Sequence, residues 1–318
     1  MPHVVYCFDA NYQQHFAASI SSLVDHYGDD PASLTVHVIT DSQDPTLDAF
    51  AEDFSTRKGV NVRINRISDD QISFLELVPR KYRDVKDYIN ISTYFRILIP
   101  QIISGDIDKV VYIDSDTVIL SDLSELFSHQ MNGKSIGAVL DIDDKINATR
   151  HGLSHYFNAG VLLMDLSALR SKKFTQKCIE YMSSEDCDAI LGDQCAINIV
   201  MQGDIKPLPR RWNRYVTNFD DSISRARDVL ADAAIIHFIT GQKPWHAWYE
   251  NELGEHYWSS LRASQWPNPV LKTPRSFGEH HRMARKLTNQ GQYPDAVSIY
   301  ETLVGHLMKK AGDLPPSA

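Results

Sequence analysis

Short runs of β-branched and aromatic residues alternate with longer segments of helical periodicity through the first two thirds of the chain. This alternation restricts the fold more than any other feature, because it predicts an α/β domain whose mostly parallel sheet is covered by helices on both faces. Ligands of such sheets bind outside the carboxyl ends of the strands. The predicted strands are residues 3–8, 34–40, 60–67, 109–113, 136–140, 159–164 and 233–239. The predicted helices include residues 12–27, 45–57 and 89–103, the last interrupted by Pro100.

Composition excludes several classes of protein. The chain has 318 residues, of which 43% are hydrophobic and 23% charged, so it is neither disordered nor collagen-like nor a coiled coil. No apolar run approaches the roughly 18 residues that a membrane-spanning helix needs. The four cysteines suggest neither a disulfide framework nor a C-x-x-C zinc site. The N-terminus shows no basic region and no cleavage site, so a cytoplasmic protein is expected.

Charge is unevenly distributed along the chain. The formal net charge of −9 argues against general nucleic-acid binding, because that function needs a basic face. Residues 271–318 contain seven basic and four acidic side chains, a net +3, so residues 1–270 carry −12. Two helical patterns, 278–290 and 294–310, lie within this basic segment. We therefore expect a main domain over residues 1–265 and a helical extension over residues 266–318.

The pattern Asp-x-Asp occurs four times, and it places two carboxylates on one side of an extended backbone, where a hard divalent cation can bind both. Asp114 and Asp116 stand out because they directly follow the apolar strand predicted at 109–113. Asp141 likewise follows the next predicted strand. The two remaining pairs have no such position, and a solvated loop explains them. We interpret Asp114 and Asp116 as a cation site and Asp141 as a neighbour that contacts a polar substrate.

Three further motifs contain residues that could bind a ligand or take part in catalysis. His237 ends a predicted apolar strand and is followed by Gly241 and Lys243, which together can supply a metal ligand and a phosphate-binding cation. Alone, such a histidine is more often a core residue, but a nearby Asp-x-Asp favours the metal interpretation. The step Asn158-Ala159-Gly160 fits either close approach of a ligand to the backbone or a β-bulge. Asp193, at the start of a helical pattern, is by itself an N-cap.

In this order, the motifs resemble glycosyltransferase family 8, the retaining enzymes of the GT-A fold, which is the fold of nucleotide-diphospho-sugar transferases. The resemblance covers roughly residues 3–265. It extends to bacterial lipopolysaccharide galactosyl- and glucosyltransferases and, more distantly, to glycogenin. The segments that carry the resemblance are 8–12 (Phe-Asp-Ala-Asn-Tyr), 91–100, 112–116 (Tyr-Ile-Asp-Ser-Asp), 157–161 (Phe-Asn-Ala-Gly-Val), 193–194 and 237–245.

The resemblance implies a role for each matching residue around a UDP-sugar donor and Mn²⁺, with Mg²⁺ as an alternative cation. The implied metal ligands are Asp114, Asp116 and His237. The implied donor-binding residues are Cys7, Asp9 and Asn11 for the uridine, Ser115 within the Asp-x-Asp motif, Gly241 and Lys243 for the diphosphate, and Arg96, Asp141 and Asn158 for the sugar. The implied catalytic residues are Gln194 and Asp193, with Gln194 beside the anomeric carbon.

Two positions depart from the family pattern, and both bear on the chemistry. Cys195 occupies a position that is often Asp, and we expect it to lie outside direct contact with the donor. Thr240 occupies a position that is usually Gly, although the six-residue spacing from His237 to Lys243 is preserved, so we expect a working loop of altered geometry. An amide such as that of Gln194 is a poor nucleophile, which favours front-side transfer over a covalent intermediate.

The expected function is transfer of galactose or glucose from a UDP-sugar to a saccharide or glycoconjugate, for example in a bacterial surface polysaccharide. One alternative is a catalytically degenerate UDP-sugar-binding scaffold, which only Cys195 supports. Another is a sugar nucleotidyltransferase, which would need a Gly-rich loop after the first strand. The C-terminal helices are expected to pack as a hairpin on the main domain or on a partner protein; the competing interpretation is weak peripheral docking at the inner membrane.

Overall fold

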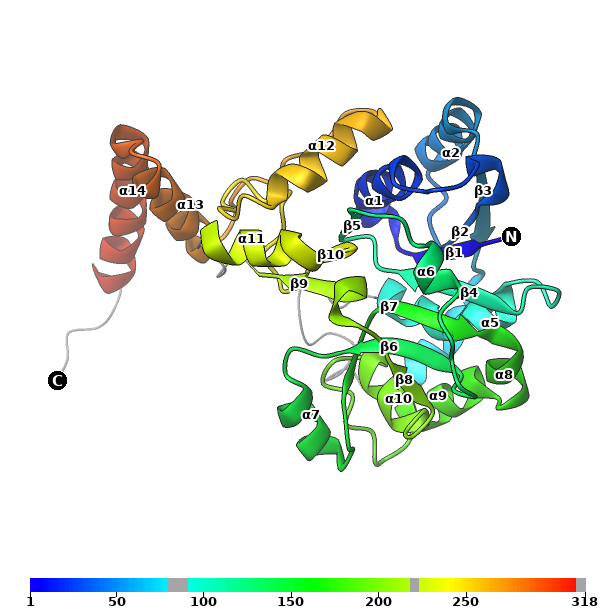
Figure 1. Cartoon of the computed structure of the whole chain (residues 1–318). Helices are drawn as coiled ribbons and strands as arrows, with labels where there is room; N and C mark the ends of the chain where they lie inside the picture. The colour runs from blue at the N-terminus through cyan, green and yellow to red at the C-terminus, as the bar shows by residue number, and fades with distance from the viewer. Residues whose placement is uncertain (79–90, 218–222, 313–318) are drawn as a thin grey trace.

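The computed structural model describes residues 1–78, 91–217 and 223–312 (Figure 1). A seven-stranded sheet with the order β3-β2-β1-β4-β7-β6-β8 forms the centre of the protein. Neighbours from β3 to β4 are parallel, as are β6 and β8, whereas β7 is antiparallel to both β4 and β6. This confirms the predicted α/β class with a mostly parallel sheet. The strands are β1 (His3–Cys7), β2 (Thr35–Thr40), β3 (Asn61–Arg66), β4 (Lys109–Ile113), β6 (Ile136–Leu140), β7 (Phe157–Asp165) and β8 (Ile205–Pro207).

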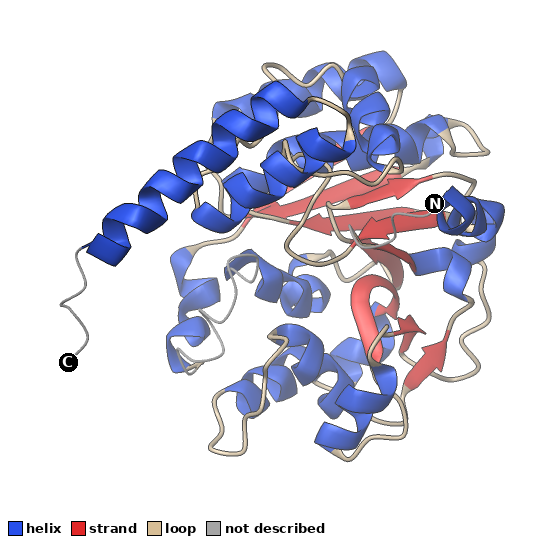
Figure 2. Ribbon diagram, turned by 90° about the vertical axis from the view of Figure 1, so that its left-hand side faces the viewer, coloured by secondary structure: helices blue, strands red, loops and turns tan. Residues whose placement is uncertain are grey.

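The sheet separates two hydrophobic cores. Along β1, Val4 and Tyr6 join one core while Val5 and Cys7 join the other, which is the period of two that a strand buried on both faces requires. Figure 2 shows the strands enclosed between helices on either side. The helices of the first core are α1 (Gln13–Asp25), α2 (Pro45–Lys58), α11 (Ile223–Asp232) and α12 (Gly254–Ser264). Those of the second core are η4 (Ile91–Leu98), α5 (Ile99–Ile102), α8 (Leu166–Ser171), α9 (Phe174–Met182) and α10 (Asp193–Val200).

Local sequence signals set several of these boundaries. Asp44 caps α2 by accepting a hydrogen bond from the Thr46 N–H, and Gly59 ends the helix in a left-handed conformation with φ of 72°. The helical pattern predicted at 89–103 divides at Pro100: a 3₁₀ segment, η4, precedes the short helix α5. Residues 89 and 90 lie outside the described residues. The remaining short elements are η1 (Ala10–Tyr12), η2 (Pro31–Ser33), α3 (Asp69–Ile72), η3 (Ser73–Leu77), α6 (Ser124–Phe127), α7 (Asp144–His151) and η5 (Arg210–Asn213).

A second, three-stranded sheet lies beside the first core. Its order is β5-β10-β9, with bounds β5 (Thr117–Ile119), β9 (Arg214–Val216) and β10 (Ile235–Phe238). The central strand β10 is antiparallel to β5 and parallel to β9. His237 of β10 is therefore opposite Thr117 on one side and Tyr215 on the other. This small sheet brings the end of the chain's main domain against the residues that follow β4.

Two C-terminal helices, α13 (Phe277–Asn289) and α14 (Tyr293–Gly312), form the predicted hairpin at one side of the molecule, with α14 outermost (Figure 1). A capping box between Ser276 and Glu279 starts α13. Lys286 attaches α13 to the main domain by donating to the Ala247 carbonyl at 2.7 Å. Within the described residues, no helix combines the length and apolarity needed to cross a bilayer.

Candidate active site

Three segments meet at the carboxyl end of β4. Asp114 follows β4, and its backbone N–H donates to the Gly160 carbonyl of β7 at 2.7 Å. Two residues later, the Asp116 carbonyl accepts from the Phe238 N–H of β10 at 3.0 Å. Because β7 is antiparallel to β4, its first residues lie at the edge where β4 ends. These backbone bonds hold both carboxylates of the Asp-x-Asp motif against β7 and β10.

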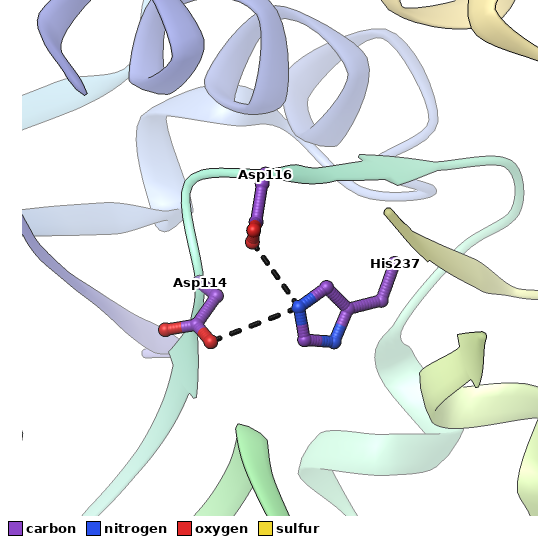
Figure 3. Close-up of side chains that lie close together, drawn as sticks. All are labelled: Asp114, Asp116 and His237. Carbon is purple, nitrogen blue, oxygen red and sulfur yellow. Dashed lines mark ion pairs between the residues drawn. The ribbon is translucent and has the colours of Figure 1, made fainter. Parts of the chain in front are cut away.

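The side chains of Asp114, Asp116 and His237 point toward one another (Figure 3). Nε2 of His237 lies 3.1 Å from Oδ1 of Asp116 and 3.8 Å from Oδ2 of Asp114. One ligand atom from each residue lies within 4.8 Å of the other two. Two carboxylates and an imidazole form a donor set that suits Mn²⁺ or Mg²⁺. The three residues predicted as ligands therefore lie close enough together for one cation to contact all of them.

Gly160 makes this convergence sterically possible. A Cβ at this position would lie 2.2 Å from Cε1 and 2.7 Å from Nδ1 of His237, and 2.9 Å from Oδ2 of Asp114. The close approach expected at the Asn158-Ala159-Gly160 step is thus made by the His237 ring. The ladder between β6 and β7 is also irregular here: Leu140 pairs with Phe157 but Ala138 pairs with Leu162, so β7 has the longer path. The irregular pairing agrees with the bulge interpretation, whereas close approach of a ligand to this step stays a prediction.

Two buried cations neutralise the carboxylates. Nζ of Lys243 lies 2.6 Å from Oδ2 of Asp116, and Nη1 of Arg96 lies 3.3 Å from Oδ1 of Asp114. Burial acts to raise the pKa of Asp116, but Lys243 and His237 outweigh this effect and hold that pKa below its ordinary value. Tyr112 adds a hydroxyl that donates to Asp114. These charges therefore favour the ionised form of Asp116.

A carboxylate and two amides form the opposite wall of the site. Oδ2 of Asp141 accepts hydrogen bonds from Nδ2 of Asn158 at 3.3 Å and from Nε2 of Gln194 at 3.1 Å. Oε1 of Gln194 in turn accepts from the Ala159 N–H at 3.0 Å. These contacts fix which end of each amide faces the site. The arrangement offers fixed hydrogen-bonding groups of both kinds, which suits a ligand rich in hydroxyls.

Asp193 adjoins these residues at the cavity, and its side chain is fully buried. Its carboxylate is 2.6 Å from Nε of Arg96, and Nη1 of Arg96 also donates to the Ala159 carbonyl at 2.6 Å. Burial raises the pKa of Asp193 to about 7, opposed by the charge of Arg96. Asp193 thus orients the arginine that faces Asp114, in addition to being the first residue of α10.

A cavity of about 380 Å³ collects most of the predicted site residues. Oγ of Ser115 is buried at its wall with no hydrogen-bond partner among the described residues. A neighbouring cavity of about 1080 Å³ shares Tyr12, Thr240 and Lys243 with the first and is lined by Asn11 and Gly241. Asp9 lines neither cavity; its carboxylate instead accepts from the Asn11 N–H at 2.9 Å. The predicted residues that line the smaller cavity are Cys7, Arg96, Asp114, Ser115, Asp116, Asp141, Asn158, Asp193, Gln194, His237 and Lys243.

Comparison with known proteins identifies the class of site. The family model for glycosyl transferase family 8 matches residues 3–249. The chain belongs to glycosyltransferase family 8. Its curated relatives include a lipopolysaccharide 1,2-glucosyltransferase of Escherichia coli K12, 24% identical over 92% of this chain and 86% of the relative. A lipopolysaccharide 1,3-galactosyltransferase of Salmonella typhimurium is 22% identical over 94% and 89%, and general stress protein A of Bacillus subtilis is 26% identical over 85% and 97%.

Solved structures support the fold of this family 8 chain. The galactosyltransferase LgtC, in complex with donor and acceptor sugar analogs, aligns with a TM-score of 0.69 at 22% identity, covering 87% of this chain and 99% of LgtC. The structure of an active-site mutant of LgtC aligns with a TM-score of 0.67 at 21% identity over 82% of this chain and 95% of that one. The expected GT-A architecture is therefore confirmed.

The structure shows the surroundings of Cys195 and the backbone conformation of Thr240, the two residues that depart from the family 8 pattern. Cys195 is fully buried on α10, its Sγ lies 3.0 Å from the Tyr156 hydroxyl, and burial raises its pKa to about 11. It is not poised as a nucleophile. Thr240 has φ of 75°, the left-handed conformation that glycine adopts without cost. Thr240 is thus strained at a position where the family usually has glycine.

Asn213 is the residue of this site that sequence reasoning missed. It is fully buried at the end of η5 and contacts both His237 and Asn158. No local pattern in the sequence distinguishes it from a structural asparagine. Tyr112 lies in the 112–116 segment that carries the family resemblance, but sequence reasoning gives it no role of its own; in the structure its hydroxyl donates to Asp114.

Proposed function

We propose that this protein is a retaining hexosyltransferase that transfers glucose or galactose from a UDP-sugar to a saccharide or glycoconjugate acceptor, using Mn²⁺ or, alternatively, Mg²⁺. One observation carries the proposal: the Asp114, Asp116 and His237 ligand atoms face one another on the wall of a cavity that also contains Lys243 and Arg96. The relatives named as lipopolysaccharide glucosyl- and galactosyltransferases support a sugar of a bacterial surface glycan as the acceptor.

The site residues fit a divalent cation. The donor set contains two carboxylates and an imidazole, and the missing Cβ of Gly160 leaves room for the ring beside Asp114. When bound, the cation would supply electrostatic stabilisation of the charge that develops on the departing diphosphate. Asp114, Asp116 and His237 would hold it. Lys243, already 2.6 Å from Asp116, places a second positive charge at the same end of the cavity.

The opposite wall would bind the donor sugar. Asp141, Asn158 and Gln194 present acceptor and donor groups whose orientations their mutual hydrogen bonds fix. Neither of the nearby alternatives for covalent catalysis is suitable, because the amide of Gln194 is a poor nucleophile and Asp193 is buried in an ion pair with Arg96. We therefore propose front-side transfer, in which Gln194 orients the sugar and the acceptor attacks the face from which the diphosphate leaves.

Release of UDP from UDP-glucose and UDP-galactose, with and without Mn²⁺, tests this function. The expected result is Mn²⁺-stimulated release from one of the two, and a loss of roughly 10²–10³-fold in Asp116→Asn with an unchanged circular dichroism spectrum. Asp186→Asn is the matched control, because Asp186 belongs to another Asp-x-Asp pattern but is exposed. Equal UDP release in Asp116→Asn and wild type would refute the metal assignment.

The same assay decides between the proposal and the scaffold alternative. A degenerate UDP-sugar-binding protein would bind UDP, detectable by calorimetry, yet release none from any UDP-hexose. Against this alternative, Cys195 is buried and its Sγ lies 3.0 Å from the Tyr156 hydroxyl. For the C-terminal hairpin we propose contact with a membrane surface or a partner protein, since α14 exposes Val297, Val304, Leu307 and Met308.

A further inference from the structure

Asn213 connects the two walls of the site. Its Oδ1 lies 2.9 Å from Nδ1 of His237, and its Nδ2 donates to Oδ1 of Asn158 at 2.8 Å. The side chain is fully buried, so water does not compete for either contact. Through Asn158 the connection continues to Asp141 and then to Gln194.

One backbone N–H fixes the orientation of the Asn158 and Asn213 amides. The N–H of Gly160 can only donate, and it lies 2.9 Å from the side chain of Asn158, so the atom facing it must be Oδ1. The Asn213 atom that contacts this same oxygen must then be the donor, Nδ2. Rotating either amide by half a turn would place two acceptors or two donors in contact. The assignment therefore follows from the backbone.

The consequence for His237 is direct. Because Nδ2 of Asn213 faces Asn158, its Oδ1 faces Nδ1 of His237, and Nδ1 must carry a hydrogen. In the neutral ring, Nε2 then carries the lone pair and is the atom that would bind a cation held between His237, Asp114 and Asp116. Metal-binding histidines are commonly oriented in this way by an acceptor on the other ring nitrogen.

We propose that Asn213 is a positioning residue that sets the tautomer and ring orientation of His237 and joins this metal ligand to the sugar-facing Asn158. The proposal rests on the metal site described under Proposed function. It assigns Asn213 a role in metal affinity without contact with the metal, donor or acceptor. Gly160 has two parts in this arrangement: its N–H fixes the amides, and its missing Cβ admits the ring.

Mn²⁺ affinity, measured by calorimetry without nucleotide, tests the proposal. Asn213→Ala should raise the Mn²⁺ Kd by about 10–100-fold, the usual effect of losing an outer-shell partner. Asn251→Ala is the matched control: Asn251 is also buried, but it donates to the Thr217 carbonyl at 3.1 Å and accepts from the Leu253 N–H at 2.9 Å, contacts with residues outside the proposed metal site. This control should leave the Kd unchanged while losing similar stability.

The ¹⁵N spectrum of histidine-labelled protein at mildly alkaline pH gives a second readout, with the His237 signals assigned from a His237→Gln spectrum. Nδ1 of His237 should be protonated in the wild type. Asn213→Asp, which keeps an acceptor toward the ring, should retain this signature, whereas Asn213→Ala should lose it. A merely structural role for Asn213 would not produce this contrast.

Two results would overturn the proposal: an Nδ1 without a proton in the wild type, or a folded Asn213→Ala with the wild-type Mn²⁺ Kd. If Asn213→Ala fails to fold, the wild-type spectrum alone decides. If the wild type binds no Mn²⁺, the proposed metal dependence fails, and the spectrum still tests the connection between Asn213 and His237.

Discussion

Replacing Gly160 with alanine should destroy the metal site while leaving the fold intact. The new Cβ would lie 2.2 Å from Cε1 of His237, which is 1.2 Å less than the 3.4 Å at which ordinary contact begins. His237 cannot rotate away freely, because it is buried and its Nδ1 contacts Asn213. Backbone strain does not contribute, since Gly160 is not among the residues with positive φ.

The fold and the metal site should differ in how well each tolerates the new methyl group. Overpacking a buried site costs about 1–3 kcal/mol of the free energy of unfolding, which a protein of this size should survive. Metal coordination tolerates displacements of only about 0.2 Å, so moving the ring by more than that removes one of three protein ligands. We therefore expect the Mn²⁺ Kd to rise by more than the roughly 10–100-fold typical of losing an outer-shell partner.

Calorimetric titration with Mn²⁺ and thermal unfolding of the same samples check both numbers. Gly137→Ala is the matched control, because Gly137 lies in β6 of the same sheet and its Cβ would meet only the end of the Leu208 side chain, at 3.1 Å. The control should bind Mn²⁺ as the wild type does. An unchanged Kd in Gly160→Ala would show that the close approach of His237 to β7 has no part in metal binding.

Three further predictions concern strain, chemistry and pH. Thr240→Gly should raise the free energy of unfolding by up to about 1 kcal/mol in urea titrations. A left-handed conformation costs roughly 1–2 kcal/mol for a residue with a Cβ, and the greater conformational entropy of glycine in the unfolded chain offsets part of the relief of that strain. A free energy of unfolding below that of the wild type would contradict the strain argument. Cys195→Ser should keep UDP release within about threefold of wild type, since Sγ contacts the Tyr156 hydroxyl and not the donor wall; a loss of about 100-fold would restore Cys195 as a functional residue. Burial lowers the pKa of His37 to about 4 from its ordinary 6.5, so between these pH values the unfolded chain binds a proton that the native state does not. The melting temperature should therefore fall as the pH drops from 6.5 toward 4. The melting temperature of a His37→Gln variant should fall less over that interval.

The three residues of the proposed cation site could be predicted because their signals are local. A continuous apolar run at 110–113 marks a buried strand, and polar residues directly after it must lie at the ligand-binding edge of a parallel sheet. His237 was also readable, since it ends an apolar run and is followed by Lys243 at a suitable distance along the chain. In each case the position within a strand determines the side chain's surroundings.

The rest of the site depends on pairings that local sequence does not encode. The apolar period of β7 shows that it is a strand but not that it runs antiparallel to β4, and only that direction brings Asn158 and Gly160 to the end of β4. Strands of three residues, such as β5 and β9, are too short to show a period. Asn213 could not be recognised for the same reason: its partners, 24 and 55 residues away in sequence, are set by tertiary structure.

The hydrogen-bonded series from His237 through Asn213, Asn158 and Asp141 to Gln194 connects the proposed cation site with the proposed sugar-binding residues. Linkage requires that any cooperativity between them be mutual: if an occupied cation site strengthens sugar binding by some factor, a bound sugar must strengthen cation binding by the same factor. Donor analogues that differ only at a hydroxyl facing Asp141 should then differ in how tightly they retain the ion, although that hydroxyl never touches it.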